Sequence, residues 1–115
     1  MLKIENITDD PLQKRTLLLE DGTIISLTMY YMPMQLGWFI RELTYLDFTL
    51  YNFRITNNYN MFHQFRNQIP FGLSCFTSDN REPTQQQDFS SGSSELFILT
   101  ESEVDEYQEY LTGQT

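Results

Sequence analysis

The chain lacks most of the residues that metal and covalent sites need. It has one cysteine and one histidine in 115 residues, so an internal disulfide and a Cys/His metal site are both excluded by count. Its five glycines are isolated, so it contains no glycine-rich phosphate loop. No apolar stretch approaches the ~20 residues of a membrane span, and residues 1–5 lack the apolar segment of a secretory signal. We therefore expect a protein retained in a cytoplasm, or assembled into something built there.

A catalytic set is also missing. His63, the single histidine, lies in a polar segment beside Phe62, and nothing in the sequence pairs it with a nucleophile. The acidic stretch Asp79–Glu82 lacks the alternating ligands and central glycine of a calcium loop. The sequence therefore predicts no catalytic, cofactor or metal site. A small hydrolase without a recognisable motif remains a third hypothesis, behind the two given below.

Basic residues are scarce, and their distribution is uneven. Seven bases oppose sixteen acids, which gives a net charge of −9. Residues 79–115 hold Arg81 alone against nine acids, and therefore carry eight of the nine net negative charges. Such a surface repels phosphates, so nucleic acid and anionic membranes are not expected as partners. The acidic end either docks onto a basic neighbour or is a solvated helix face.

What the sequence does contain is typical of a small β domain. Aromatic residues make up 15% of the chain, enough to build a compact core. Alternating apolar and polar residues predict a hairpin over 16–31, with Asp21 and Gly22 in a type I′ turn. Further strands are predicted at 38–45, 50–55, 71–77 and 96–99, with a helical turn near 61–65. We expect a single domain over residues 1–115, mainly β, in a small barrel or sandwich of about six antiparallel strands with a short C-terminal helix.

The aromatic residues in these strands have two interpretations. One is a hydrophobic core, for which the strand pattern favours Trp38, Phe53, Phe71, Leu73 and Phe97. The other is an exposed stacking surface, as in a free-standing β domain that binds a peptide or a carbohydrate. Core packing is favoured, and the binding domain is kept as the alternative function.

The last third of the chain predicts a loop and a helix. Residues 79–94 are polar, with runs of glutamine and serine, and such long loops are commonly functional. We expect a neighbouring chain to order this loop, and the fold to survive its partial deletion. Thr100 and Glu103 form a capping box that starts an acidic helix over about 101–111. Its apolar side should be formed by Val104, Tyr107, Tyr110 and Leu111. The residues expected to contact a partner are Glu82, Asp88, Phe89, Glu103, Glu106 and Glu109.

The order of several short motifs resembles a known family. The motifs are Gly37-Trp38-Phe39, Asn52-Phe53-Arg54-Ile55, Gln64-Phe65-Arg66, Ile69-Pro70-Phe71-Gly72-Leu73, Glu82-Pro83-Thr84, Asp88-Phe89 and Glu95-Leu96-Phe97-Ile98-Leu99. This order is similar to that of the small baseplate plug proteins of contractile-tailed phages, of the cyanophage type. The resemblance covers about residues 15–105. Gly37 stands alone where the family has paired glycines, and the loop and the tail are longer.

The resemblance implies a structural virion protein, assembled in the host cytoplasm. Such a plug lies in the tail baseplate and braces the central hub at the end of the tail tube. Its partners would be other tail proteins (hub, tube, spike or wedge), contacted by several copies around a symmetry axis. The implied function is mechanical, and the family provides no catalytic residue to transfer.

Overall fold

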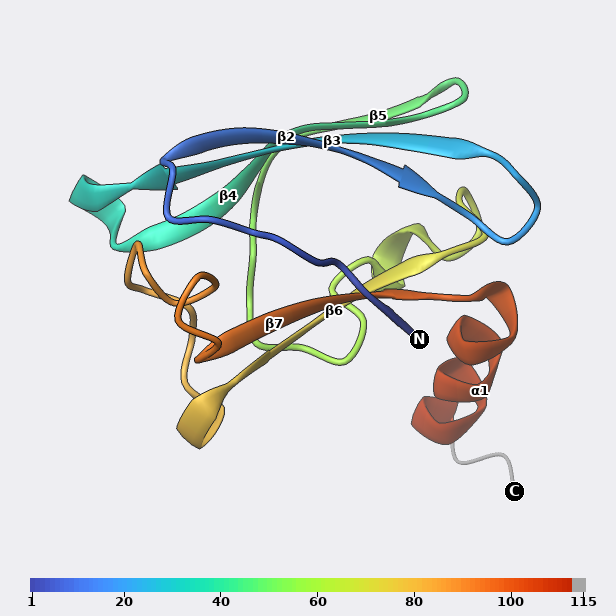
Figure 1. Cartoon of the computed structure of the whole chain (residues 1–115). Coiled ribbons are helices and arrows are strands. Elements are labelled where there is room, and N and C mark those ends of the chain that lie inside the picture. The colour runs from blue at the N-terminus through green and yellow to red at the C-terminus, as the bar shows by residue number, and fades with distance from the viewer. Residues whose placement is uncertain (113–115) are drawn as a thin grey trace.

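The computed structural model describes residues 1–112 and shows two antiparallel sheets packed face to face (Figure 1). The four-stranded sheet has the order β2-β3-β4-β5, formed by Leu12–Leu18, Ile24–Met32, Gly37–Tyr45 and Phe48–Arg54. The three-stranded sheet has the order β1-β7-β6, formed by Leu2–Lys3, Ser94–Leu99 and Gly72–Thr77. The mainly β prediction is confirmed, and the architecture is a sandwich rather than a closed barrel.

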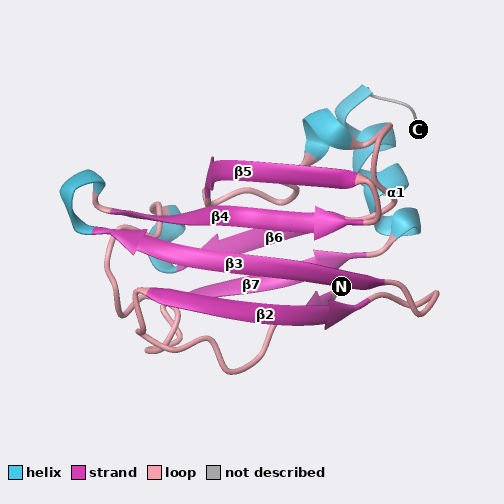
Figure 2. Ribbon diagram, turned by 90° about the horizontal axis from the view of Figure 1, so that it is seen from above, coloured by secondary structure: helices cyan, strands magenta, loops and turns pink. Residues whose placement is uncertain are grey.

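Helices are few in the described chain. Helix α1, Glu101–Thr112, follows β7 and lies at one end of the sandwich (Figure 1). Three 3-10 turns are formed by Pro33–Gln35 (η1), His63–Phe65 (η2) and Ser78–Asn80 (η3). The second of these is the helical turn that the sequence predicts near 61–65. Seen from above, β2 and β5 form the two edges of the four-stranded sheet (Figure 2).

The core lies between the sheets and follows the period of two. Ile25, Leu27 and Met29 of β3 all point inward and are fully buried, because successive side chains of a strand face opposite sides. Leu73 and Cys75 of β6 meet them from the other sheet, as do Leu96 and Ile98 of β7. The interior is therefore built from the inward positions of both sheets.

Four of the five predicted core residues belong to this core. Trp38, Phe71 and Leu73 are buried, and Phe53 is half-buried against the cluster. Phe97 is a correction: it lies on the outer face of β7, half-exposed, with its ring 5.7 Å from that of Phe76. The side chains of β7 that point inward are those at even-numbered positions. Residues 96–99 are all apolar, so the sequence does not show which of them face the core and which face outward.

Two strand predictions are also corrected. The hairpin is predicted to begin at Thr16, whereas β2 begins at Leu12, and β1 is not predicted. Residues 13–15 are polar, yet the Gln13 side chain is buried and donates to the carbonyls of Thr8 and Asp10. The inward side chain of this part of β2 is polar and bonds to a neighbouring loop. Apolar and polar residues therefore do not alternate there, and the alternation cannot identify the strand.

The hairpin turn differs from the predicted type I′ form. Only Gly22 has a positive φ, of 88°, whereas a type I′ turn needs one at Asp21 as well. The Gly22 N–H donates to the Leu19 carbonyl, and the Leu19 N–H donates to the Thr23 carbonyl. The connection is therefore a three-residue loop with Gly22 in the left-handed position. The Asp21 carboxylate accepts the Thr23 N–H at 2.9 Å.

The segment between β5 and β6 is anchored by Asn60, which gives a stability prediction. Its buried Oδ1 accepts the N–H groups of Phe62 and Leu73. A Cβ at Gly72 would lie 2.6 Å from this oxygen, and the side chain cannot move away without losing both bonds. We expect Gly72→Ala to lower the free energy of unfolding by about 1–3 kcal/mol in urea denaturation.

Gly37→Ala is the matched control for that variant. Its Cβ would lie 2.7 Å from Nη2 of Arg54, the far end of a flexible side chain that can shift. The expected loss is therefore below about 1 kcal/mol. Equal losses in the two variants would contradict the anchoring role of Asn60.

Candidate functional site

Cys75 and His63 are the residues best suited to nucleophilic chemistry, and both are in packing contacts. Cys75 is fully buried, and this burial raises the pKa of its thiol to about 12, so the thiol stays protonated at neutral pH. The His63 ring lies 5.9 Å from the ring of Tyr107 and contacts it edge-on. Within residues 1–112, no group of three or more His, Cys, Asp or Glu side chains is placed to hold a metal ion.

No helix in the described part of the chain is long and apolar enough to cross a membrane.

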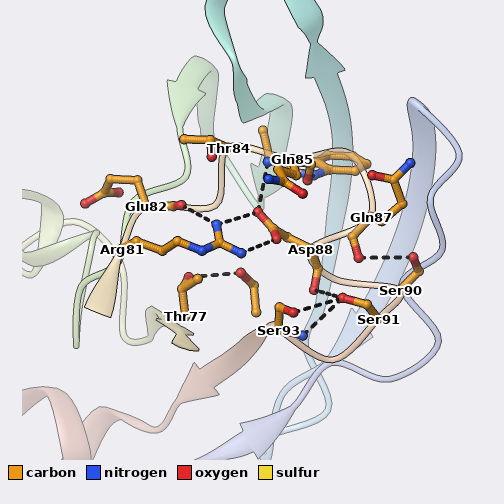
Figure 3. A network of polar contacts seen from close by, with 12 residues as sticks. Thr77, Arg81, Glu82, Thr84, Gln85, Gln87, Asp88, Ser90, Ser91 and Ser93 are labelled. Atoms are coloured by element: carbon orange, nitrogen blue, oxygen red, sulfur yellow. Dashed lines mark hydrogen bonds and ion pairs between the residues drawn. The ribbon is translucent and has the colours of Figure 1, made fainter. Parts of the chain in front are cut away.

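The long loop is organised around a buried carboxylate, that of Asp88 (Figure 3). Asp88 is 2% exposed and accepts two bonds from the Arg81 guanidinium, at 2.5 and 3.0 Å, and one from the Gln85 N–H at 2.9 Å. The hydrogen bond from Arg81 is the main cause that lowers the pKa of Asp88. The only base of residues 79–115 is thus committed to an internal ion pair.

The other side of the loop packs against β3 and β4. The Phe89 ring meets the ring of Trp38 edge-on, at 5.7 Å between centroids. The Trp38 indole N–H donates to the Gln85 carbonyl, and the Tyr31 hydroxyl donates to the Thr84 carbonyl. The loop therefore closes one end of the core within the single chain.

These contacts correct two partner predictions. Asp88 and Phe89 are buried inside their own chain, so neither side chain is presented to a neighbour. The expectation that a neighbour orders the loop is wrong for the same reason. Deleting residues 84–93 would remove both side chains, so the fold is not expected to survive that deletion. Glu82 is exposed, and its carboxylate accepts the Asn57 N–H at 2.8 Å.

Helix α1 begins with the predicted capping box. The Glu103 N–H donates to the Thr100 hydroxyl at 3.3 Å, and the Thr100 N–H donates to Glu103 Oε1 at 2.9 Å. Partial burial alone would raise the pKa of Glu103, but hydrogen bonds from the terminal ammonium of Met1 and from Thr100 outweigh it, and the pKa is lowered. Glu103 thus caps the N-terminus of α1 and is half-buried. Its side chain is therefore poorly placed to contact a partner.

The apolar side of α1 is narrower than predicted. Val104 is buried, and the Tyr107 ring stacks on that of Tyr59 at 4.8 Å between centroids. Tyr110, expected on the same side, is 80% exposed, and Leu111 is also exposed. In Figure 1 the helix lies at the end of the sandwich and leads away from it toward the C-terminus.

The exposed surface of α1 is strongly acidic. Glu106 and Glu109 are exposed, and α1 contains no basic residue. Its five acids recur at spacings of three and four, as in Glu101 and Asp105, or Glu106 and Glu109. Like charges at these spacings cost a helix roughly 0.2–0.5 kcal/mol per pair. A cationic surface beside α1 would relieve this repulsion, so the helix is the candidate partner-binding surface.

The alternative interpretation of the aromatic residues is an exposed stacking surface, and on the four-stranded sheet such a surface would lie on the outer face. Tyr30 and Phe39 lie 5.8 Å apart between centroids, and the Arg54 guanidinium lies 5.4 Å from the Phe39 ring. Both rings are half-buried by these mutual contacts, and Tyr51 is the well-exposed ring on this face. One exposed tyrosine is a small platform for a carbohydrate, so this face supports the alternative function only weakly.

Arg81 is not among the residues predicted for the site. The sequence could have indicated it, because Arg81 is the single basic residue of residues 79–115, which also contain nine acids. The motifs that support the family resemblance also prove to be structural. Ile69 and Phe71 are buried, and Thr84, Asp88 and Phe89 hold the loop in place. These motif residues therefore stabilise the fold and are not presented to a partner.

Comparisons with known proteins add no relative to this picture. A scan against protein-family models finds no match, and a search of curated proteins finds none either. The family resemblance therefore depends on the motif order alone.

Proposed function

We propose that the chain is a structural, non-catalytic protein of a phage tail baseplate, which plugs or braces the central hub at the end of the tail tube. The order of the motifs, from Gly37-Trp38-Phe39 to the strand at 95–99, supports the identity of the particle. The observation that carries the assembly role is helix α1, which begins at the capping box of Thr100 and Glu103, contains five acids and no base, and exposes Glu106 and Glu109.

The proposed partner surface is basic and belongs to another tail protein: hub, tube, spike or wedge. The charge of residues 79–115 would steer such a neighbour to α1 and speed its docking at modest ionic strength. Several copies around a symmetry axis would multiply a contact that is weak in each copy.

A charged surface also suits the mechanical task. Exposed ion pairs contribute only about 0–1 kcal/mol each, and salt screens them. A contact made of such pairs holds the hub when many copies act together. It can separate without unfolding the sandwich when the sheath contracts.

Charge reversal on α1 tests the proposal. Glu106→Lys combined with Glu109→Lys should reduce incorporation into tail particles at least about tenfold, which corresponds to 1.4 kcal/mol of lost binding. The measurement is quantitative mass spectrometry of purified particles, with the tube protein as reference. The circular dichroism of the isolated variant should be unchanged.

The matched control reverses two exposed carboxylates elsewhere. Asp9→Lys combined with Asp47→Lys changes the net charge equally, away from α1. We expect this variant to enter particles normally. If both double variants enter normally, or both fail equally, α1 is not the partner surface.

A further inference from the structure

The edge of strand β2 has unused hydrogen-bonding groups. The Tyr31 N–H donates to the Pro11 carbonyl, and the Leu19 N–H donates to the Thr23 carbonyl. In an antiparallel ladder the bonded pairs alternate, so the odd-numbered residues of β2 bond to β3 and the even-numbered ones point away. The outward N–H of Leu12 is taken by Asp10 Oδ1. Those of Lys14, Thr16 and Leu18 have no acceptor within residues 1–112.

Two open cavities lie beside this edge. β1 and β2 are edge strands of different sheets and are not bonded to each other, and we call the gap between them the seam. Two cavities, of about 410 and 270 Å³, open into it and share Leu2, Leu18 and Ile98 as lining residues. Phe71 and Leu99 line the larger one, and Leu2 and Leu18 are 63% and 65% exposed. The seam thus combines free backbone groups with an apolar floor.

The charges along the seam differ between its ends. The larger cavity is flanked by the carboxylates of Glu20, Asp21 and Glu101. The smaller one is lined by Lys3 and Arg15 together with Glu5. Lys3 is paired with Glu95, and Arg15 bonds to the Asn6 carbonyl, so these two cations are already engaged. The unbalanced charge is therefore the negative group around the larger cavity.

We propose that the seam binds an extended segment of a different protein, which adds to the sheet as a strand beside β2. Its main chain bonds to the outward groups of Lys14, Thr16 and Leu18. Its inward side chains, two residues apart, are apolar and enter the two cavities, and a lysine or arginine follows where the segment passes Glu20 and Glu101. This is the strand-addition mode of peptide recognition, in which the main chain gives affinity and the cavities give specificity.

This site does not depend on the proposed baseplate function. It uses the edge of β2 and the seam, and no acid of α1 beyond its first residue. Like charge disfavours one register of a second copy of this chain, because pairing β2 with itself about Arg15 would place two Arg15 side chains opposite each other.

The test is an unbiased selection on the full chain with a displayed library of random heptapeptides as the probe. We expect enriched sequences with apolar residues at alternate positions and a basic residue at one end. A synthetic peptide of the enriched sequence should protect the Thr16 and Leu18 amides from hydrogen exchange.

Two substitutions at one position separate backbone pairing from side-chain contact. Thr16→Pro removes the outward N–H without removing a bond to β3, and Thr16→Val keeps that N–H but removes the hydroxyl. We expect the peptide to bind Thr16→Val like the parent chain and to bind Thr16→Pro at least about tenfold more weakly. Glu20→Lys combined with Glu101→Lys should select an acidic residue in place of the basic one.

Three results would overturn the proposal. The first is a selection that enriches no sequence, and the second is a peptide that binds Thr16→Pro as tightly as Thr16→Val. The third is a parent chain that sediments as a dimer and becomes a monomer with Thr16→Pro, since the occupant would then be a second copy.

Discussion

Trp38→Ala is expected to lower the free energy of unfolding by about 3–5 kcal/mol, through lost transfer energy and the cavity left behind. Trp38 is 0% exposed and contacts both the sheet and the loop. Its ring meets those of Tyr31 and Phe89 at 5.5 and 5.7 Å, and its indole N–H donates to the Gln85 carbonyl. A loss of this size is a large fraction of the 5–15 kcal/mol typical of natural domains. Urea denaturation measures it.

Two controls accompany this variant. Trp38→Phe keeps most of the buried ring but loses the bond to Gln85, so a smaller loss of about 1–2 kcal/mol is expected. Tyr110→Ala removes an aromatic ring that is 80% exposed, and should change stability by less than about 0.5 kcal/mol. Unchanged stability in Trp38→Ala would contradict the position of this ring and of the loop that packs on it.

Asp88→Ala should cost about 2–3 kcal/mol, because it leaves the Gln85 N–H and the Arg81 guanidinium without their acceptor. This loss of stability is smaller than the loss expected for a fully buried ion pair, because the Arg81 side chain is 38% exposed. Asp47→Ala, which removes an exposed carboxylate, is the control and should be nearly neutral.

The same carboxylate gives a pH dependence. The pKa of Asp88 is lowered in the folded chain, mainly by the hydrogen bond from Arg81. Its contribution to stability is therefore complete above the unfolded pKa of about 4 and is lost as the pH falls through the lower folded value. The difference in stability between the parent chain and Asp88→Asn should shrink between pH 7 and pH 2. A constant difference would mean that Asp88 is not held as a carboxylate.

Local patterns in the sequence predict local structure well here. The alternation of Ile25, Leu27 and Met29 identifies β3 and its buried face. Thr100 and Glu103 identify the start of α1, because both partners of a capping box lie within one turn. In both cases the interaction lies within a few residues, so its period or spacing is visible in the sequence.

The predictions that prove wrong concern contacts between residues that are distant in the sequence. Phe89 packs on Trp38, more than forty residues away, and this turns a polar loop into part of the core. The seam joins residues from β1, β2 and β7, and no spacing within one segment can indicate it. The exposure of Tyr110 has a similar origin, because it depends on how α1 lies against the end of the sandwich and not on the spacing of residues within the helix.

The most direct test of the proposed function is a cryo-EM map of the contractile tail particle in which we propose that this chain resides. We expect density for the two-sheet sandwich at the hub, at the end of the tail tube, with the exposed face of α1 against a basic surface of another tail protein. A particle whose hub lacks this sandwich would contradict the baseplate assignment. A sandwich at the hub whose helix α1 faces solvent would contradict the role given to its acidic face.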